Sequence, residues 1–421
     1  MAPVDRDLVV GDRYPGEAAG LALGTDGGFV AVHADGSEIF QWGGLDGRPG
    51  WSTRLSSGRS PEAGQGVTVG SSRCVADNAP GTPVVSATHV VCLVPNGVAP
   101  LPDASLPPEG LPAMSIVVLD AADGSVTAQW ASPGAQSIAV FSGLVVVGSG
   151  TATESVIDGR DMATGAERWS FGYAGPQVTA NAVTRVQRAS GLIAADTSSG
   201  QRWVFATDGT PVRDGGVEAS PSGGWRVDPL TQRLTFSGPS AATGGTQTTL
   251  LAPNAQTAGD QTFDGVPVDV TVDDASIPGL MLTVGPQLYG GDTDSGAQRW
   301  ALDGTTFSGS SGTSAIVVRG RVYVLAGPRV IAVEGHTGKE LWRTKDEDGV
   351  RPTTVMTDGR HVLVGFDAVS ARGNPELIAY DFSDGREAFR TELPTGISHV
   401  GAAGGTLFGF DDHDRELVTL H

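Results

Sequence analysis

The sequence contains few of the residues on which the commonest functional assignments depend. Only two cysteines and two lysines occur in 421 residues, and 27 basic side chains stand against 47 acidic ones, a net charge of −20. An acidic surface repels nucleic-acid phosphates and anionic lipid head groups. We therefore expect no nucleic-acid binding and no direct membrane insertion of this chain, whereas cationic proteins, metal ions and polyamines remain as partners.

Long apolar runs and a recognisable leader are also missing. No segment approaches the ~18 apolar residues of a membrane span, and the best one, Ile138 to Val147, is interrupted by Ser142 and Gly143. The first seven residues lack the basic and apolar regions of a signal peptide. Either the protein is cytosolic, or an N-terminal anchor has been removed from in front of this sequence.

Helix breakers, by contrast, are abundant. The chain has 61 glycines and 26 prolines. Relative to alanine, a glycine in a helix interior costs about 1 kcal/mol of stability and a proline about 3 kcal/mol. Apolar residues make up 39% of the chain, too many for a disordered protein, and the glycines have no three-residue period. These observations predict a large all-β globular protein.

The two cysteines lie on neighbouring strand-like segments. Cys74 is in Val67–Ala76 and Cys92 is in Val84–Val94. If these segments pair and the Cβ atoms face each other, a disulfide forms, which indicates an oxidising compartment. Two buried free thiols are the alternative.

An internal repeat organises the chain. Four copies place an acid at position i, glycine at i+4 and an aromatic residue at i+8: Asp161/Gly165/Trp169, Asp292/Gly296/Trp300, Glu334/Gly338/Trp342 and Asp381/Gly385/Phe389. Variants with altered spacing are Asp120/Gly124/Trp130, Asp196/Gly200/Trp203 and Leu45–Trp51. The acid and glycine are typical of a hairpin turn, and an alternating strand follows each turn.

The spacing of the aromatic residues predicts the fold. The basic unit of about forty residues is the size of a four-stranded propeller blade, and Gly224–Asn254 is predicted to be a hidden unit without its marker. We predict a single eight-bladed β-propeller of four-stranded antiparallel blades over residues 20–421, after an N-terminal segment 1–19. Spare strands leave seven or nine blades open. The ring would be closed by pairing Gly401–His421 with Leu8–Val10.

The pattern Asp-x-x-Thr-Gly-x-x-x-Trp, repeated in all-β units, resembles the pyrroloquinoline-quinone (PQQ)-like β-propeller repeat. Quinoprotein alcohol dehydrogenases and the outer-membrane assembly factor BamB belong to that superfamily. The resemblance covers residues 20–421 and is clearest over 114–174 and 280–394. It implies that the tryptophans dock between adjacent blades, so that the repeat residues named above are structural.

The resemblance does not extend to a quinone site. Quinoprotein dehydrogenases have a vicinal cysteine pair beside the cofactor, Ca²⁺ and an Asp base, whereas the cysteines here are 18 residues apart in a shorter chain. We therefore predict neither PQQ nor Ca²⁺, and assign no catalytic, cofactor or metal residues. The acidic clusters Asp269–Asp274 and Asp411–Glu416 are more typical of hairpin turns than of calcium loops.

We thus expect a non-catalytic, monomeric, extracytoplasmic propeller that serves as a scaffold for protein partners, cationic ones among them, at the cell envelope. The proline-rich insert 95–112 and the loop 239–262 are the candidate recognition elements. The composition is typical of a GC-rich bacterial genome, such as an actinobacterial one, and the resemblance implies a membrane anchor in front of the propeller in such organisms. The alternatives are a cytoplasmic protein, and an enzyme, PQQ- and Ca²⁺-dependent or other, with its site at the central channel.

Overall fold

In the computed structural model the described residues are 10–15, 29–32, 38–43, 48–54, 73–77, 87–95, 114–141, 143–150, 154–174, 183–197, 202–213, 225–228, 230–240, 244–253, 259–302, 313–345, 351–367, 375–403, 406–411 and 416–420. The chain divides into two compact units. One comprises Met1–Tyr14, Ser222–Ala252 and Gln256–His421, and the other comprises Pro15–Pro221 and Pro253–Ala255.

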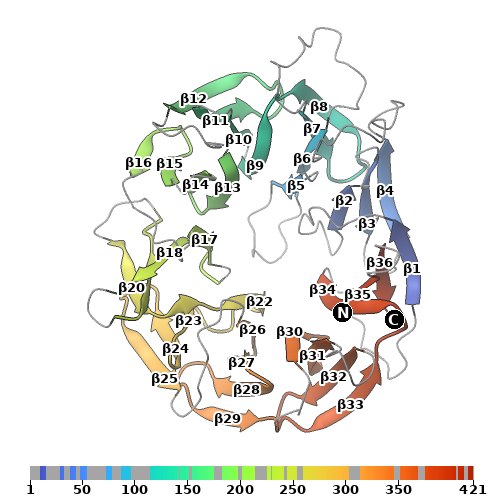
Figure 1. Ribbon diagram of the computed structural model, residues 1–421, viewed down its shortest axis with the longest axis vertical. Coiled ribbons are helices and arrows are strands. Elements are labelled where there is room, and N and C mark those ends of the chain that lie inside the picture. The colour runs from blue at the N-terminus through green and yellow to red at the C-terminus, as the bar shows by residue number, and fades with distance from the viewer. Residues whose placement is uncertain are drawn as a thin grey trace. The chain divides into compact units, whose positions relative to one another are not determined.

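Four sheets make up the described part of the unit that begins at Pro15 (Figure 1). Their strands are β2 (Phe29–Val32), β3 (Glu38–Gly43) and β4 (Arg48–Arg54); β5 (Arg73–Ala76), β6 (His89–Pro95), β7 (Met114–Asp120) and β8 (Val126–Ala131); β9 (Ala135–Phe141), β10 (Leu144–Gly150), β11 (Glu154–Asp161) and β12 (Glu167–Ala174); and β13 (Val183–Ala189), β14 (Leu192–Thr197), β15 (Arg202–Ala206) and β16 (Pro211–Arg213).

The other unit contains the remaining sheets. Their strands are β17 (Trp225–Val227), β18 (Leu234–Pro239), β19 (Thr246–Leu250) and β20 (Gln261–Asp264); β21 (Val266–Pro267), β23 (Leu280–Val284), β24 (Leu288–Asp292) and β25 (Gln298–Leu302); β22 (Asp269–Asp273), β26 (Ser314–Val318), β27 (Arg321–Ala326), β28 (Arg329–Glu334) and β29 (Glu340–Arg343); β30 (Arg351–Thr357), β31 (His361–Asp367), β32 (Glu376–Asp381) and β33 (Glu387–Glu392); and β34 (Ile397–Ala403), β35 (Thr406–Asp411), β36 (Glu416–Leu420) and β1 (Val10–Pro15).

The predicted fold class is confirmed. The described elements are strands, consecutive strands pair antiparallel, and most sheets have the four strands of a propeller blade. The count of eight blades is not confirmed, because the described strands form nine sheets. Nine was one of the numbers that the spare strands left open.

The two ends of the chain share a sheet. Strand β1, from the N-terminal segment, pairs with β36 and completes the sheet β1-β36-β35-β34 (Figure 1). The sequence predicts this contact between the C-terminal piece and Leu8–Val10. The N-terminal strand begins at Val10, and the two residues before it lie outside the described residues.

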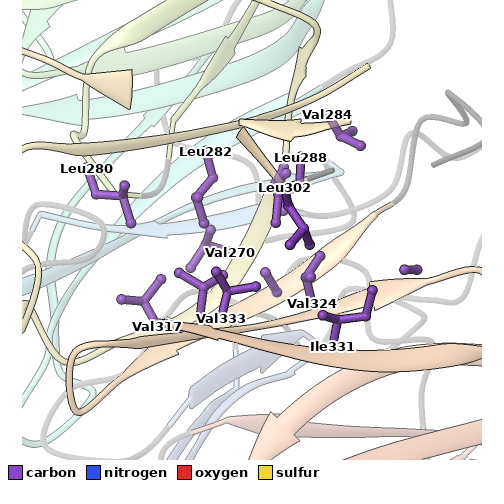
Figure 2. Close-up of a cluster of buried hydrophobic side chains, with 14 of the residues drawn as sticks. Val270, Leu280, Leu282, Val284, Leu288, Leu302, Val317, Val324, Ile331 and Val333 are labelled. Atoms are coloured by element: carbon purple, nitrogen blue, oxygen red, sulfur yellow. The ribbon is translucent and has the colours of Figure 1, made fainter. Parts of the chain in front are cut away.

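The core lies between successive sheets, and one strand supplies two parts of it. Val322 and Val324 of β27 belong to the cluster shared with the preceding sheet, which Figure 2 shows around Val324 and Ile331. Tyr323, on the opposite face of β27, belongs to the cluster shared with the sheet β30–β33. Because both faces are covered, β27 is a nearly continuous apolar run rather than an alternating one.

Candidate functional site

The repeat turn uses its acidic residue to fix the backbone. Oδ1 of Asp161 accepts hydrogen bonds from the backbone N–H groups of Ala163 (3.1 Å) and Thr164 (3.0 Å) and from the Thr164 hydroxyl (2.9 Å). The Gly165 N–H donates to the Asp161 carbonyl (2.8 Å), and Gly165 has φ +70°. These bonds close the hairpin between β11 and β12, so this carboxylate has a structural task.

An arginine completes two of the turns. Oδ2 of Asp161 accepts from Arg168, and Oδ2 of Asp292 accepts from Nη2 of Arg299 at 2.7 Å. The Arg168 hydrogen bond is the largest cause that lowers the pKa of Asp161 from 3.8 to about 2. Arg299 likewise holds the pKa of Asp292 well below its ordinary value. Both carboxylates are therefore charged and bonded within their own hairpins.

In most copies of the repeat, the tryptophan contacts a turn of the next sheet. The Trp300 indole Nε1 donates to the Gly335 carbonyl at 2.8 Å, and its ring lies against Gly338. The same type of hydrogen bond joins Trp51 to Ala121 (3.0 Å), Trp169 to Thr207 (3.1 Å) and Trp342 to Phe382 (3.0 Å). These contacts are the docking that the family resemblance implies for the tryptophans.

The turn at Gly124 has the same backbone geometry, although the sequence groups it with a tryptophan two residues further away than in the other copies. Gly124 has φ +72°, and its N–H donates to the Asp120 carbonyl at 2.9 Å. The ring that lies against Gly124 belongs to Trp51 of the preceding sheet and not to Trp130, because a Cβ added to Gly124 would be 2.3 Å from a Trp51 ring atom. The altered spacing to Trp130 therefore leaves the turn itself unchanged, and the grouping Asp120/Gly124/Trp130 joins residues that contact different sheets.

Two aromatic markers, Trp130 and Phe389, lack this hydrogen bond among the described residues. Trp130 lies against Gly165, but among the described residues its buried Nε1 has no hydrogen-bond partner. Phe389 has no such donor, and it packs beside the cluster that joins the sheet β30–β33 to the sheet of β34–β36. The feature that these aromatic residues share is therefore the packing of the ring on a glycine or on an apolar cluster. The indoles of Trp51, Trp169, Trp300 and Trp342 donate a hydrogen bond in addition.

In the sheet β13–β16, the glycine that a tryptophan contacts is not the one that the sequence motif indicates. Trp169 lies against Gly209, in the turn between β15 and β16. The predicted copy Asp196/Gly200/Trp203 falls between β14 and β15 instead, and Gly200 lies outside the described residues. Trp203 is buried and its ring is 5.8 Å from that of Phe171.

The hidden unit has two features that sequence reasoning missed. Its fourth strand, β20, begins at Gln261, which occupies the place of the tryptophan beside Gly296 and donates to the Asp294 carbonyl at 3.2 Å. A repeat-like turn also stands at Asp228, where Gln232, with φ +55°, replaces the glycine. The spacing Asp228/Gln232/Phe236 follows the i, i+4, i+8 rule, so a search that allowed residues other than glycine would have found it.

Asp228 is the most deeply buried carboxylate of these turns. It is 1% exposed, and Oδ2 accepts from the Thr231 N–H (2.8 Å) and hydroxyl (2.7 Å). Burial raises the pKa of Asp228, against the opposing effect of Thr231, Arg226 and Arg233. Oδ1 has no hydrogen-bond partner among the described residues. Thr235 stands where Arg168 and Arg299 stand in the other turns, so Asp228 lacks that partner.

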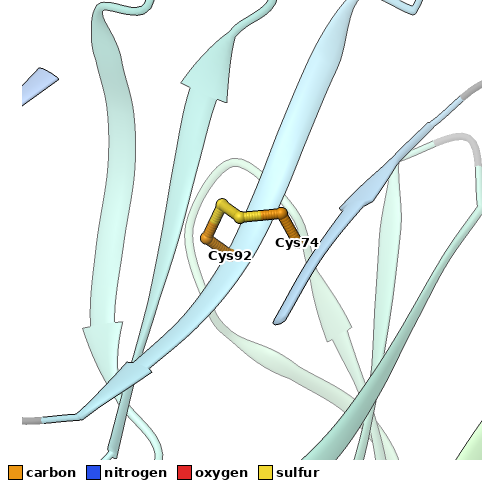
Figure 3. The surroundings of a disulfide bond; sticks show 2 residues. All are labelled: Cys74 and Cys92. Atoms are coloured by element: carbon orange, nitrogen blue, oxygen red, sulfur yellow. A yellow bond between two sulfur atoms is a disulfide. The ribbon is translucent and has the colours of Figure 1, made fainter. Parts of the chain in front are cut away.

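The predicted disulfide is present. Cys74 of β5 lies directly opposite Cys92 of β6, with a Cα–Cα distance of 4.1 Å, and the two sulfur atoms are bonded (Figure 3). Both residues are buried. This cross-strand bridge does not fit the vicinal cysteine pair of a quinone site. In the described part of the chain, no group of three or more His, Cys, Asp or Glu side chains is placed to hold a metal ion.

The two candidate recognition elements have different outcomes. All of the insert 95–112 except Pro95 lies outside the described residues, so its role stays a prediction. The stretch 239–262 was expected to be a loop, but it contains β19 and the first residues of β20. The reason is the run Thr246–Leu250, in which β-branched residues alternate and Thr248 and Leu250 are buried.

One of the acidic clusters is also not a hairpin turn. Asp269–Asp273 forms strand β22, which pairs parallel with β26. The cluster at 411–416 includes four residues outside the described part of the chain. Over the residues that the structure describes, no helix is long and apolar enough to cross a membrane.

Comparison with known proteins identifies a family that part of the chain matches. Residues 279–396 match the family model described as "Outer membrane protein assembly factor BamB", and this segment holds the turns at Asp292, Glu334 and Asp381. The class is thus a β-propeller repeat protein, and the resemblance to the PQQ-like, BamB-type repeat is confirmed over these residues. The match covers less than a third of the chain. No curated protein matches its sequence.

Several solved structures resemble the chain at low identity. BamB from Moraxella catarrhalis is 14% identical, with 99% of this chain and 100% of that chain covered and a TM-score of 0.46. The computationally designed Ika8 protein is 14% identical, with 99% and 100% covered and a TM-score of 0.45. The C-terminal WD40 domain of Sif2 is 12% identical, with 79% and 92% covered and a TM-score of 0.44.

Proposed function

We propose that this chain is a non-catalytic β-propeller that serves as a protein-binding scaffold in an extracytoplasmic compartment. The observation that carries the proposal is that the polar side chains of the repeat are hydrogen-bonded within the framework. The carboxylates of Asp161 and Asp292 are bonded to their own turns and arginines, and the indole of Trp300 is bonded to the next turn. Groups engaged in this way stabilise the framework, which leaves the connections for recognition.

The compartment is inferred from the disulfide and from the family match. A buried cross-strand disulfide is typical of proteins that fold in an oxidising environment. The description of the matching family, an outer membrane protein assembly factor, supports the same location and a role in binding other proteins. Attachment to a membrane through a segment in front of Met1 is part of the proposal, as is a monomeric state.

The proposal is tested by capturing partners from envelope and cytosolic fractions of the source organism after in-cell crosslinking. We expect a discrete partner in the envelope fraction only, and its loss when residues 96–111 are replaced by a short Gly-Ser linker. Trp342→Ala, which weakens a sheet contact in the other unit, serves as the stability control. Partners that are purely cytosolic, or none, would overturn the proposal.

Thermal melting with PQQ and Ca²⁺ tests the non-catalytic part. A ligand that binds the folded state raises the melting midpoint by mass action. We expect no shift with either compound or with both. A saturable rise with PQQ in the presence of Ca²⁺ would contradict a non-catalytic scaffold and indicate a quinoprotein.

A further inference from the structure

Strand β22 is the terminal strand of the sheet β22-β26-β27-β28-β29. Its one described strand partner is β26, with which it pairs parallel, and hydrogen bonds from Asp269 N to Thr313 O (2.9 Å) and from Asp274 N to Val317 O (3.1 Å) extend this pairing. Within the described residues no strand pairs with its other edge. The chain therefore already extends this sheet by one strand, and β22 presents the next edge.

The side chains of β22 separate into an anchoring set and an exposed set. Val270 is 7% exposed and packs in the cluster of Figure 2, beside Val317 and Val333. Asp269, Thr271 and Asp273 are exposed. The Thr271 hydroxyl donates to the Val355 carbonyl at 2.9 Å, which fixes the strand relative to β30. Consequently β22 is held rigidly while its exposed positions carry two carboxylates.

These carboxylates are only partly neutralised. Oδ1 of Asp269 is 3.3 Å from Nη2 of Arg226, but the Asp269 side chain is 64% exposed. Asp273 accepts the Ala275 N–H at 2.9 Å, and no ion pair involves it in the described part of the chain. Burial, and then the neighbouring charge of Asp274, raise the pKa of Asp273. The strand and the residue after it thus carry three carboxylates, Asp269, Asp273 and Asp274, with one ion pair to them among the described residues.

The nearest further arginine is used elsewhere. The Arg319 backbone N–H donates to Oδ2 of Asp274 at 2.7 Å, but its guanidinium donates to the Gly359 carbonyl (2.8 Å) and lies 5.1 Å from the centre of the Phe382 ring. The positive charge of Arg319 is therefore directed away from β22. A cation from outside the described chain would complement this edge.

We propose that the free edge of β22 binds an extended, cationic segment of a protein partner by strand addition, with Lys or Arg side chains opposite Asp269 and Asp273. The register of β22 with β26 shifts between Val270 and Val272, so that Asp269 pairs with Ser314 and Asp273 pairs with Val317. The two aspartates therefore lie on opposite faces of the sheet, and a partner segment without a bulge carries its two cations at positions i and i+3. Backbone hydrogen bonds supply the affinity of such a mode, and side chains supply the specificity. This inference rests on the proposed scaffold function and names the chemistry of its partner.

A competing explanation is that the aspartates only protect an exposed edge. Charged residues on edge strands prevent unwanted pairing in many β proteins. The two explanations predict opposite results with a cationic strand. Protection predicts no saturable binding of any extended peptide, whereas the proposed site binds a cationic one and rejects its acidic counterpart.

The test uses the full chain and fluorescence anisotropy of the peptide Thr-Lys-Val-Thr-Lys-Val-Thr. Two comparison peptides carry Glu in place of Lys, or N-methyl groups on the amides of one edge. We expect saturable binding of the first peptide alone, at least tenfold stronger than either comparison. Equal binding of the N-methylated peptide would mean attraction by charge without strand addition, and no binding would mean edge protection only; either result overturns the proposal.

Paired variants locate the site. Asp269→Asn with Asp273→Asn removes two charges from β22, and Asp123→Asn with Asp384→Asn removes two from the exposed turns β7–β8 and β32–β33. We expect the first pair to weaken binding about 5- to 30-fold, as for two exposed ion pairs of ~0.5–1 kcal/mol each, and the second pair to leave it unchanged. Equal effects of the two pairs would refute the assignment to β22.

The crosslinking experiment separates this inference from the scaffold proposal. If the envelope partner is still captured by the Asp269→Asn and Asp273→Asn chain as strongly as by the unmodified one, the β22 site is wrong and the scaffold function stands. If no partner is captured by either chain, the scaffold function fails, whatever the peptide does. Melting curves of each variant check that the chain is folded.

Discussion

The indole Nε1 of Trp342 donates a hydrogen bond to the carbonyl of Phe382 at 3.0 Å, across 40 residues of sequence. The donor lies on β29, the last strand of one sheet, and the acceptor lies in the turn between β32 and β33 of the next sheet. The Trp342 ring also lies against Gly385 of that turn. One side chain thus joins two sheets by packing and by a hydrogen bond, and the first prediction concerns it.

Trp342→Ala should destabilise the unit by about 3–5 kcal/mol, because it empties a buried aromatic site. Trp342→Phe retains most of the ring but loses the donor, and should cost at least the ~1 kcal/mol of a hydrogen bond. Urea unfolding monitored by circular dichroism measures both. Leu341→Ala, at the exposed neighbouring position, is the control and should change stability by less than about 0.5 kcal/mol. Equal effects at positions 341 and 342 would refute the docking role.

Gly338→Ala should be more destabilising than Gly320→Ala. The two glycines have nearly equal φ angles, +71° and +73°, so alanine meets the same backbone penalty of about 1–2 kcal/mol at each. A Cβ on Gly338 would be 2.6 Å from Trp300 Cβ, whereas one on Gly320 would meet nothing within 4 Å. The difference between the variants therefore measures the steric contact alone. Indistinguishable melting temperatures would show that Trp300 can move aside.

Reduction of the Cys74–Cys92 bridge should destabilise the unit that contains it. Intact mass should rise by about 2 Da on reduction, and closing a loop with a sequence separation of 18 is worth about 3 kcal/mol in the chain-entropy model. Urea midpoints of the oxidised chain, the reduced chain and the Cys74→Ala, Cys92→Ala chain provide the measurement. The reduced chain and the double alanine variant should have similar urea midpoints, both lower than that of the oxidised chain. A midpoint unaffected by reduction would contradict this expectation.

The Asp161 carboxylate should contribute stability that is lost in acid. Its pKa is about 2 in the folded chain and ordinarily 3.8, mainly because of the hydrogen bond from Arg168. A lowered folded pKa means that the contribution is fully present above the unfolded pKa and is lost as pH falls through about 2.

Melting temperatures between pH 6 and pH 2 should therefore fall less steeply for Asp161→Asn than for the unmodified chain. Arg168→Gln removes the main cause of the shift and should move the loss to higher pH. A pH dependence identical in all three chains would show that the pair has no energetic role.

Much of the fold can be predicted because its signal is local. The hydrogen bonds of the Asp161 carboxylate in its turn all come from residues within seven positions along the sequence. The repeat, its period, the strands on either side and the cysteine pairing across neighbouring strands all follow from this kind of information. The family match over 279–396 spans three consecutive turns of this kind.

The tertiary structure decided which residues meet between sheets. No local rule distinguishes Gly209 from Gly200 as the contact of Trp169, or selects Gln261 for the place of a tryptophan beside Gly296. On sequence alone, the acidic run that begins at Asp269 is typical of a turn. It forms a strand because it pairs with the edge of β26 and because Val270 is buried in the core. The sequence by itself determined the blade and its turn, whose interactions are short-range. Packing against distant strands determined the partners of each blade, because those contacts exist only once the sheets are formed.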